Sequence, residues 1–146
     1  MATLQEFEKQ FILLCETGFI AVNQFDEDAA VKLFKAAQIL SPHNTLPQIG
    51  FGYLHLCKLE LRQAAEMFDS VLQKEPSNEM AKTFLGITLS FLPNELSKGE
   101  KILDQVARGA ENAEIKTLAD TALNFVDNFI KKSPSPVQPQ TTKKKP

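Results

Sequence analysis

The amino-acid sequence predicts an all-α protein of about three consecutive helical hairpins. Two observations support this fold class: similar residues recur every 34 positions, and apolar residues follow the spacing of one helix face. Four pairs carry the repeat most clearly, namely Gly18 and Gly52, Ala30 and Ala64, Phe34 and Phe68, and Pro42 and Pro76. A unit of this length cannot bury its apolar surface alone, so we expect the units to stack on one another.

The first unit is expected to cover residues 11–44. Apolar and small residues mark one face of each of its two helices: Phe11, Leu14, Gly18 and Ala21 on the first, and Ala30, Phe34 and Ala37 on the second. Thr3 and Glu6 have the spacing of a capping box, in which each side chain accepts a hydrogen bond from the other residue's backbone amide. The first helix is therefore expected to begin near Thr3.

The second and third units are expected at residues 45–78 and 79–111. The repeat reaches Gly86 in step and then slips by one residue at Leu92–Asn94, because a turn between two helices tolerates an insertion. Small residues of each unit let its two helices approach closely. One large apolar residue of each unit is expected to fill the space between one hairpin and the next: Phe34, Phe68 and Leu103.

A final helix is expected over residues 112–132, where apolar residues continue at helical spacing. This helix would cap the last hairpin, which would otherwise expose its apolar face. Residues 3–132 thus form one predicted domain. Residues 133–146 contain four prolines, three lysines and a single aliphatic residue, and they predict a disordered, solubilising tail.

Composition excludes several kinds of partner. The chain has a formal net charge of -2, and its only run of three lysines is in the tail, so no basic patch for nucleic acid is expected. Membrane insertion is not expected either, because no apolar stretch approaches the roughly 18 residues that span a bilayer. The first residues do not resemble a secretory signal. Cys15 and Cys57 are expected to be reduced and buried, which suits the cytoplasm.

The sequence does not predict an enzyme, a metal site or a cofactor. His43 lies in a turn after Pro42, and His55 lies in an apolar helix, where a core or groove-edge role is expected. The glycines of Gly50–Gly52 lack the third glycine and the preceding strand of a dinucleotide loop. The acids of Asp26–Asp28 are expected to favour the start of a helix through its dipole rather than to do acid–base chemistry.

The repeat resembles the tetratricopeptide consensus. Ten positions carry the resemblance: Leu14, Gly18, Ala30, Phe34, Ala37, Pro42, Gly52, Ala64, Phe68 and Pro76. It implies a short right-handed solenoid in which the first helix of each hairpin lines a concave surface. Eleven residues are then expected to line this surface and bind a partner: Ile12, Cys15, Phe19, Val22, Leu46, Ile49, Tyr53, Leu56, Met80, Thr83 and Ile87.

The expected concave surface is apolar. Neither the stretch between Asn44 and Cys57 nor that between Thr83 and Asn94 contains an Asp, Glu, Lys or Arg. A helix that is apolar nearly all round is buried on two sides, by its own repeats and by something else. Three coverings are open at this point: a partner protein, a second copy of the free chain, or the third unit and the final helix folding over the surface. A clamp for a peptide carboxylate is disfavoured, because the basic residues it needs are absent.

The chain is small and acidic, with about three such units and an apolar groove. In these features it resembles the cytoplasmic chaperones of bacterial type III secretion. The short amino-terminal segment is similar to the branch that serves the needle subunit. The resemblance implies that the groove holds the hydrophobic helix of a needle subunit and prevents premature polymerisation before export, together with a small co-chaperone. Two alternatives remain: a chaperone of the translocator proteins, and a general tetratricopeptide adaptor in a protein complex.

Overall fold

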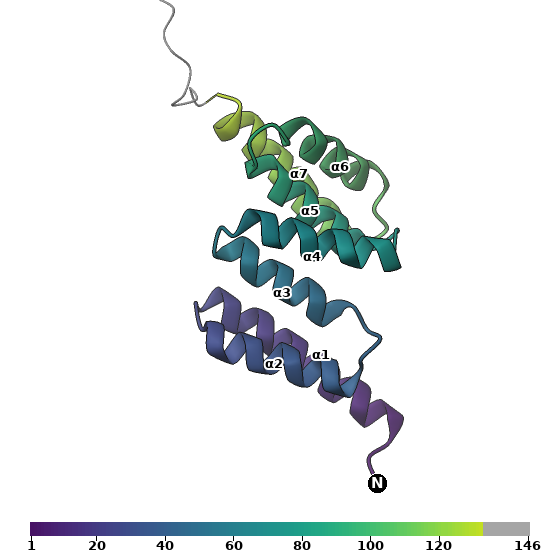
Figure 1. The fold of residues 1–146 in the computed structure, drawn as a ribbon. Coiled ribbons are helices and arrows are strands. Elements are labelled where there is room, and N and C mark those ends of the chain that lie inside the picture. The colour runs from purple at the N-terminus through teal and green to yellow at the C-terminus, as the bar shows by residue number, and fades with distance from the viewer. Residues whose placement is uncertain (133–146) are drawn as a thin grey trace, which may run out of the picture.

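The computed structural model describes residues 1–132, and the predicted tail at residues 133–146 lies outside the described residues. Residues 1–132 form seven α-helices and a final turn of π-helix (Figure 1). The bounds are α1 (Leu4–Asn23), α2 (Glu27–Leu40), α3 (Leu46–Cys57), α4 (Leu61–Lys74), α5 (Glu79–Phe91), α6 (Leu96–Gly109), α7 (Ala113–Phe125) and η1 (Val126–Ile130). The predicted all-α class is confirmed for this part of the chain.

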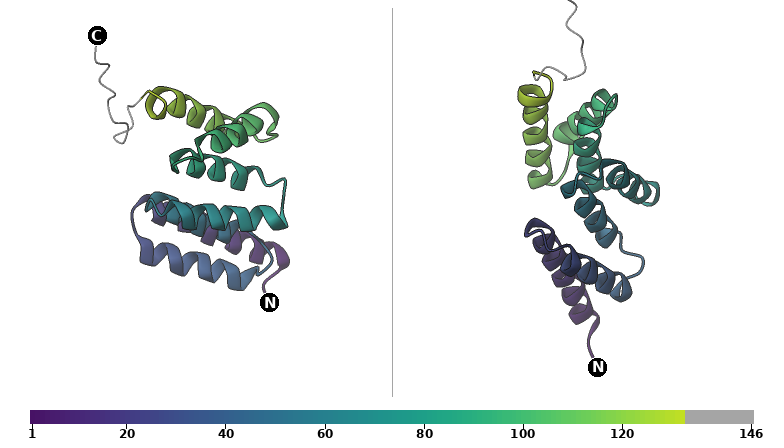
Figure 2. Two further views of the ribbon diagram at one scale, coloured as in Figure 1. Left: turned by 45° about the horizontal axis from the view of Figure 1, so that its top comes forward. Right: turned by 60° about the vertical axis from the view of Figure 1, so that its left-hand side comes forward.

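The helices pack as three consecutive hairpins followed by α7. Helix α1 pairs with α2, α3 with α4, and α5 with α6. The odd-numbered helices also contact one another in sequence, from α1 through α3 and α5 to α7, and form one continuous row. Figure 2 shows the first hairpin at one end of the stack and α7 at the other. A surface on the odd-numbered row therefore draws on residues from all three hairpins and α7.

Short polar side chains fix where several helices begin. The predicted capping box is present at α1, where the amide of Thr3 donates to Glu6 Oε2 at 2.7 Å and the amide of Glu6 donates to Thr3 Oγ1 at 3.3 Å. Asp26 accepts from the amide of Ala29 at the start of α2, at 3.1 Å. Asn78 and Asn112 cap α5 and α7 in the same way. These side chains satisfy amides that the helices leave free.

Large apolar residues hold the hairpins together, as the sequence predicted. Phe34, Phe68 and Leu103 are buried completely. A side chain at Gly18 would lie 2.5 Å from the ring of Phe34, and one at Gly52 would lie 2.6 Å from the ring of Phe68. The repeated glycines therefore leave the space that the next large residue fills.

The turns inside the hairpins share an uncommon backbone conformation. Phe25 and Leu59 occupy equivalent positions of the first two units and both have a φ of 60°, and Asn94 has a φ of 65°. The amides that follow, of Asp26 and Glu60, each donate at 2.9 Å to a carbonyl five residues earlier and close the helix end. Asn94 comes one position later than a full repeat after Leu59, so the one-residue slip lies in the turn between α5 and α6, where the sequence placed it.

Glycine at position 25 is expected to stabilise the protein by about 1 kcal/mol. The ring of Phe25 is 90% exposed and contributes little packing, while its left-handed backbone disfavours any residue with a Cβ. Chemical denaturation of Phe25→Gly and Phe25→Ala separates the two effects, because alanine removes the ring but keeps the strain. Equal stability of the two variants would show that the backbone at this turn is not strained.

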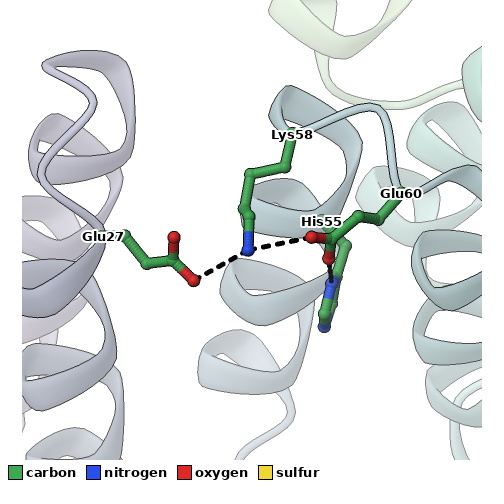
Figure 3. Close-up of polar contacts among 4 residues, drawn as sticks. All are labelled: Glu27, His55, Lys58 and Glu60. Atoms are coloured by element: carbon green, nitrogen blue, oxygen red, sulfur yellow. Dashed lines mark hydrogen bonds and ion pairs between the residues drawn. The ribbon is translucent and has the colours of Figure 1, made fainter.

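Hydrogen bonds between turns hold the two ends of the second hairpin together at one edge of the stack and join this hairpin to the first at the other edge. At one edge, Thr45 Oγ1 donates to Glu75 Oε2 at 2.7 Å. At the other edge, Lys58 Nζ lies 2.8 Å from Glu27 Oε1 and 2.9 Å from Glu60 Oε1, and His55 Nδ1 lies 2.5 Å from Glu60 Oε2 (Figure 3). Hydrogen bonds from Lys58 and then His55 hold the pKa of Glu60 below its ordinary value. The Glu27–Lys58 pair thus joins the first hairpin to the second.

Acid is expected to weaken the contact between the turns at Thr45 and Glu75. Hydrogen bonds from Asn78 and Thr45 lower the pKa of Glu75 from its ordinary value of 4.5. A carboxyl with a lowered pKa in the folded state stabilises the fold above its unfolded pKa, and this contribution is lost as the pH falls through the folded pKa. We therefore expect Glu75→Gln to narrow the difference in Tm between pH 7 and pH 3. The exposed acid Glu8 provides the control, since Glu8→Gln is expected to keep the wild-type difference, and equal behaviour of both variants would contradict the prediction.

Candidate partner-binding groove

An apolar groove runs along the row of odd-numbered helices. It encloses a volume of about 620 Å³ and receives residues from α1, α3, α5 and α7. Its lining is made of Phe19, Asn23, Tyr53, Leu56, Cys57, Leu59, Met80, Phe84, Ile87, Phe91 and Leu118. None of these described lining residues carries a formal charge. A surface of this kind gains free energy by binding apolar side chains.

Helix periodicity explains how α5 supplies the largest share of the groove. Met80, Phe84, Ile87 and Phe91 follow one another at intervals of four, three and four residues, so all four lie on one face. The opposite side of α5 carries the buried residues Leu85 and Leu89, which pack into the core. The groove face of α5 therefore does not take part in packing the helix into the core and remains available to a partner.

A row of aromatic rings forms the floor of the groove. The ring centroids of Phe19 and Tyr53 lie 5.6 Å apart, and those of Tyr53 and Phe84 lie 5.3 Å apart. Each end of this row contacts a completely buried ring: Phe19 lies 5.4 Å from Phe34, and Phe84 lies 5.6 Å from Phe68. These separations are typical of favourable aromatic pairs. The floor is consequently anchored to the core before any partner arrives.

The polar side chains of the groove lining form a hydrogen bond with each other or remain uncharged. Tyr53 Oη donates to Asn23 Oδ1 at 2.5 Å, so these two side chains bond to each other. Burial, with a smaller effect of Cys57, raises the pKa of Tyr53 to about 12, and partial desolvation of its thiol raises the pKa of Cys57. Both groups are therefore uncharged at neutral pH. Cys57 is an exposed free thiol, which corrects the expectation that both cysteines are buried; Cys15 is buried as expected.

Five of the eleven predicted contact residues line the groove: Phe19, Tyr53, Leu56, Met80 and Ile87. Ile12 and Leu46 lie instead on a separate pocket at the amino-terminal end of α1. The predicted residues therefore lie on the row of helices that carries the groove, but only five of them are on its lining.

Four predicted contact residues belong to the core and do not present a surface to a partner. Cys15, Val22, Ile49 and Thr83 are 0%, 3%, 2% and 1% exposed. Cys15, Ile49 and Thr83 are equivalent residues of the three successive units, so the whole series occupies one buried position of the repeat. Helix α3 has no charged residue, so the apolar pattern around Ile49 could not show which side of that helix faces solvent.

Six residues line the groove that the sequence pattern did not predict: Asn23, Cys57, Leu59, Phe84, Phe91 and Leu118. Phe84 was hidden by the repeat itself, because Gly50 occupies the equivalent position of the preceding unit and is buried. The spacing of Met80, Phe84, Ile87 and Phe91 was the available signal. Leu118 could be assigned only once α7 was seen to pack beside α5.

Two kinds of feature are absent from residues 1–132. They contain no group of three or more His, Cys, Asp or Glu side chains that could hold a metal ion. No helix in this part of the chain combines the length and apolar character needed to cross a membrane. No family model, curated protein or solved structure matches the chain.

Proposed function

We propose that the chain is a tetratricopeptide-like, non-catalytic binding protein that holds an amphipathic helix of a partner protein in the groove. The observation that carries this proposal is an uncharged, aromatic groove of about 620 Å³ to which four consecutive odd-numbered helices contribute. The repeated glycines and the recurring left-handed turns support a short solenoid, because each unit repeats the same packing.

The chemistry of the lining favours a helix over an extended peptide. An extended segment would bring unpaired backbone amides and carbonyls into the groove, and each buried group without a partner is costly. Asn23 and Tyr53 already bond to each other, so the described lining has little to offer such groups. A helix satisfies its own backbone and can place one apolar stripe on the aromatic floor.

A needle subunit of bacterial type III secretion is the partner class that the proposal favours. The resemblance of the repeat stack to the needle-subunit chaperones implies this class, and an apolar groove suits a helix that polymerises when free. In this proposal the protein acts in the cytoplasm, with a small co-chaperone, and releases its partner for export. The translocator proteins and a larger multi-protein assembly are the alternative partners.

Co-purification of the full chain from its own cells, followed by mass spectrometry, tests this assignment. The proposal predicts a small helical secretion subunit in a defined ratio with the chain. Recovery of a translocator protein would move the assignment to the other chaperone branch. Recovery of several subunits of a large assembly would support the adaptor and contradict the chaperone function.

A further inference from the structure

The outer face of α1 carries two large apolar side chains in contact with solvent. Leu13 is 62% exposed and Ile20 is 55% exposed. They lie seven residues apart, which places them on the same side of α1. The buried residues Phe11, Cys15 and Gly18 lie on a different side of the same helix. These two side chains therefore form a surface separate from the hairpin core.

The repeat shows what normally packs at these positions. One full repeat takes Leu13 to Pro47 and Ile20 to Leu54, and a second repeat takes them to Ala81 and Thr88. All four later residues are buried. Leu54 packs in one cluster with Ala30 and Phe34 of α2, and Ala81 packs in one cluster with Phe68 of α4. Leu13 and Ile20 thus occupy positions that elsewhere receive the second helix of the preceding hairpin.

The two ends of the stack differ in how they meet solvent. At the far end, α7 exposes a polar side with Lys116, Asp120 and Asn124 at intervals of four residues. Terminal repeats need a polar outer side of this kind to stay soluble. At the other end, Leu13 and Ile20 remain large and apolar, and no helix among residues 1–132 covers them. The outer face of α1 is therefore built like an interior packing surface.

Charge distinguishes between two occupants of this face. Glu16 lies between Leu13 and Ile20 along α1, is exposed, and takes part in none of the ion pairs among residues 1–132. A symmetric antiparallel pair of α1 helices that packs Leu13 against Ile20 of the second copy would bring the two Glu16 carboxylates together and repel. The exposed Lys9, four residues before Leu13 on the same side, would lie outside the centre of that pair. A helix with a basic residue between its apolar side chains complements the face instead.

We infer that Leu13, Glu16 and Ile20 form a second docking surface, at which an amphipathic helix of another protein, with a basic residue facing Glu16, packs on α1. The docked helix takes the place that α2 takes on α3 and that α4 takes on α5. This surface is independent of the groove, so a partner can occupy each at the same time.

Two synthetic helical peptides test the inference on the full chain by fluorescence anisotropy. Both peptides share one leucine and phenylalanine stripe, and they differ only in carrying lysines or glutamates beside it. We expect the lysine peptide to bind at least tenfold more tightly than the glutamate peptide. Glu16→Lys is expected to reverse this preference, whereas Asp120→Lys on α7 is expected to keep it. The double variant Leu13→Ser and Ile20→Ser is expected to lower the affinity for the lysine peptide at least tenfold, while the Tm of the protein stays unchanged.

Measurements in the Ile87→Asp background separate this surface from the groove, because Ile87 lines the groove and its replacement is expected to weaken binding there alone. The inference is overturned if binding of the lysine peptide disappears with Ile87→Asp, or if Glu16→Lys leaves the preference unchanged. Sedimentation tests the remaining occupant: a dimer that Leu13→Ser and Ile20→Ser dissociate would assign the face to a second copy of the chain.

Discussion

Replacement of Phe34 by alanine is expected to lower the free energy of unfolding by about 3–5 kcal/mol. The ring is completely buried and lies against Gly18 of the first hairpin and Gly50 of the second. It also pairs with the rings of Phe19 and Phe51, with both centroid separations at 5.4 Å. Its removal therefore leaves a cavity at the junction of two hairpins. Neither hairpin can move to fill this cavity without losing contacts with the other.

Urea denaturation of Phe34→Ala and Phe25→Ala measures this effect with a matched control. Phe25 is 90% exposed in a turn, so its replacement by alanine is expected to change the stability by no more than about 0.5 kcal/mol. Because small domains are stable by only about 5–15 kcal/mol, Phe34→Ala is expected to approach unfolding at 37 °C. A loss below about 1 kcal/mol for Phe34→Ala would contradict the role of this ring as the link between the hairpins.

An aspartate at position 87 is expected to weaken partner binding by at least about 30-fold while helix content is retained. Ile87 lines the groove and is only partly buried in the free chain, so its carboxylate can stay hydrated until a partner binds. The complex would bury that charge against an apolar helix at a cost of at least about 2 kcal/mol, which corresponds to the stated loss.

Calorimetry with the co-purified partner, together with circular dichroism, checks this prediction. Ile39→Asp serves as the control, because Ile39 is exposed on α2 and lies outside the groove. Ile49→Asp is expected to lower helix content as well as binding, since Ile49 is a core residue. Undiminished binding by Ile87→Asp would remove the groove from the proposed function.

The sequence predicted the stacking of the hairpins because the residues responsible are either glycine, the smallest residue, or large apolar residues such as phenylalanine. A glycine and a large apolar residue 16 positions apart, as in Gly18 and Phe34 or Gly52 and Phe68, fit each other in space and recur at a fixed period. Their positions could therefore be predicted from a single chain. The short polar caps at Thr3 and the one-residue slip near Asn94 follow equally local rules.

The side of each helix that forms the groove could be predicted only in part. Helix α3 has no charged residue between Leu46 and Cys57, so its pattern does not separate a core side from a partner side. For this reason the pattern assigned Ile49 to the same surface as Tyr53, four residues later, whereas the structure buries Ile49 and places Tyr53 on the groove lining. The left-handed backbone of Phe25 and Leu59 also leaves no local signal, because both residue types disfavour it. Tertiary packing decides both features.

Photo-cross-linking at Phe91 tests the central claim most directly. Phe91 lies on the groove lining and is partly exposed, so p-benzoyl-phenylalanine at this position reports what enters the groove in living cells. The same probe at Ile39 on the outside of α2 is the control. The account predicts one adduct at position 91, formed with an amphipathic helical segment of a single partner, and no such adduct at position 39. Adducts at position 39 without any at position 91 would contradict the claim that this groove holds the partner.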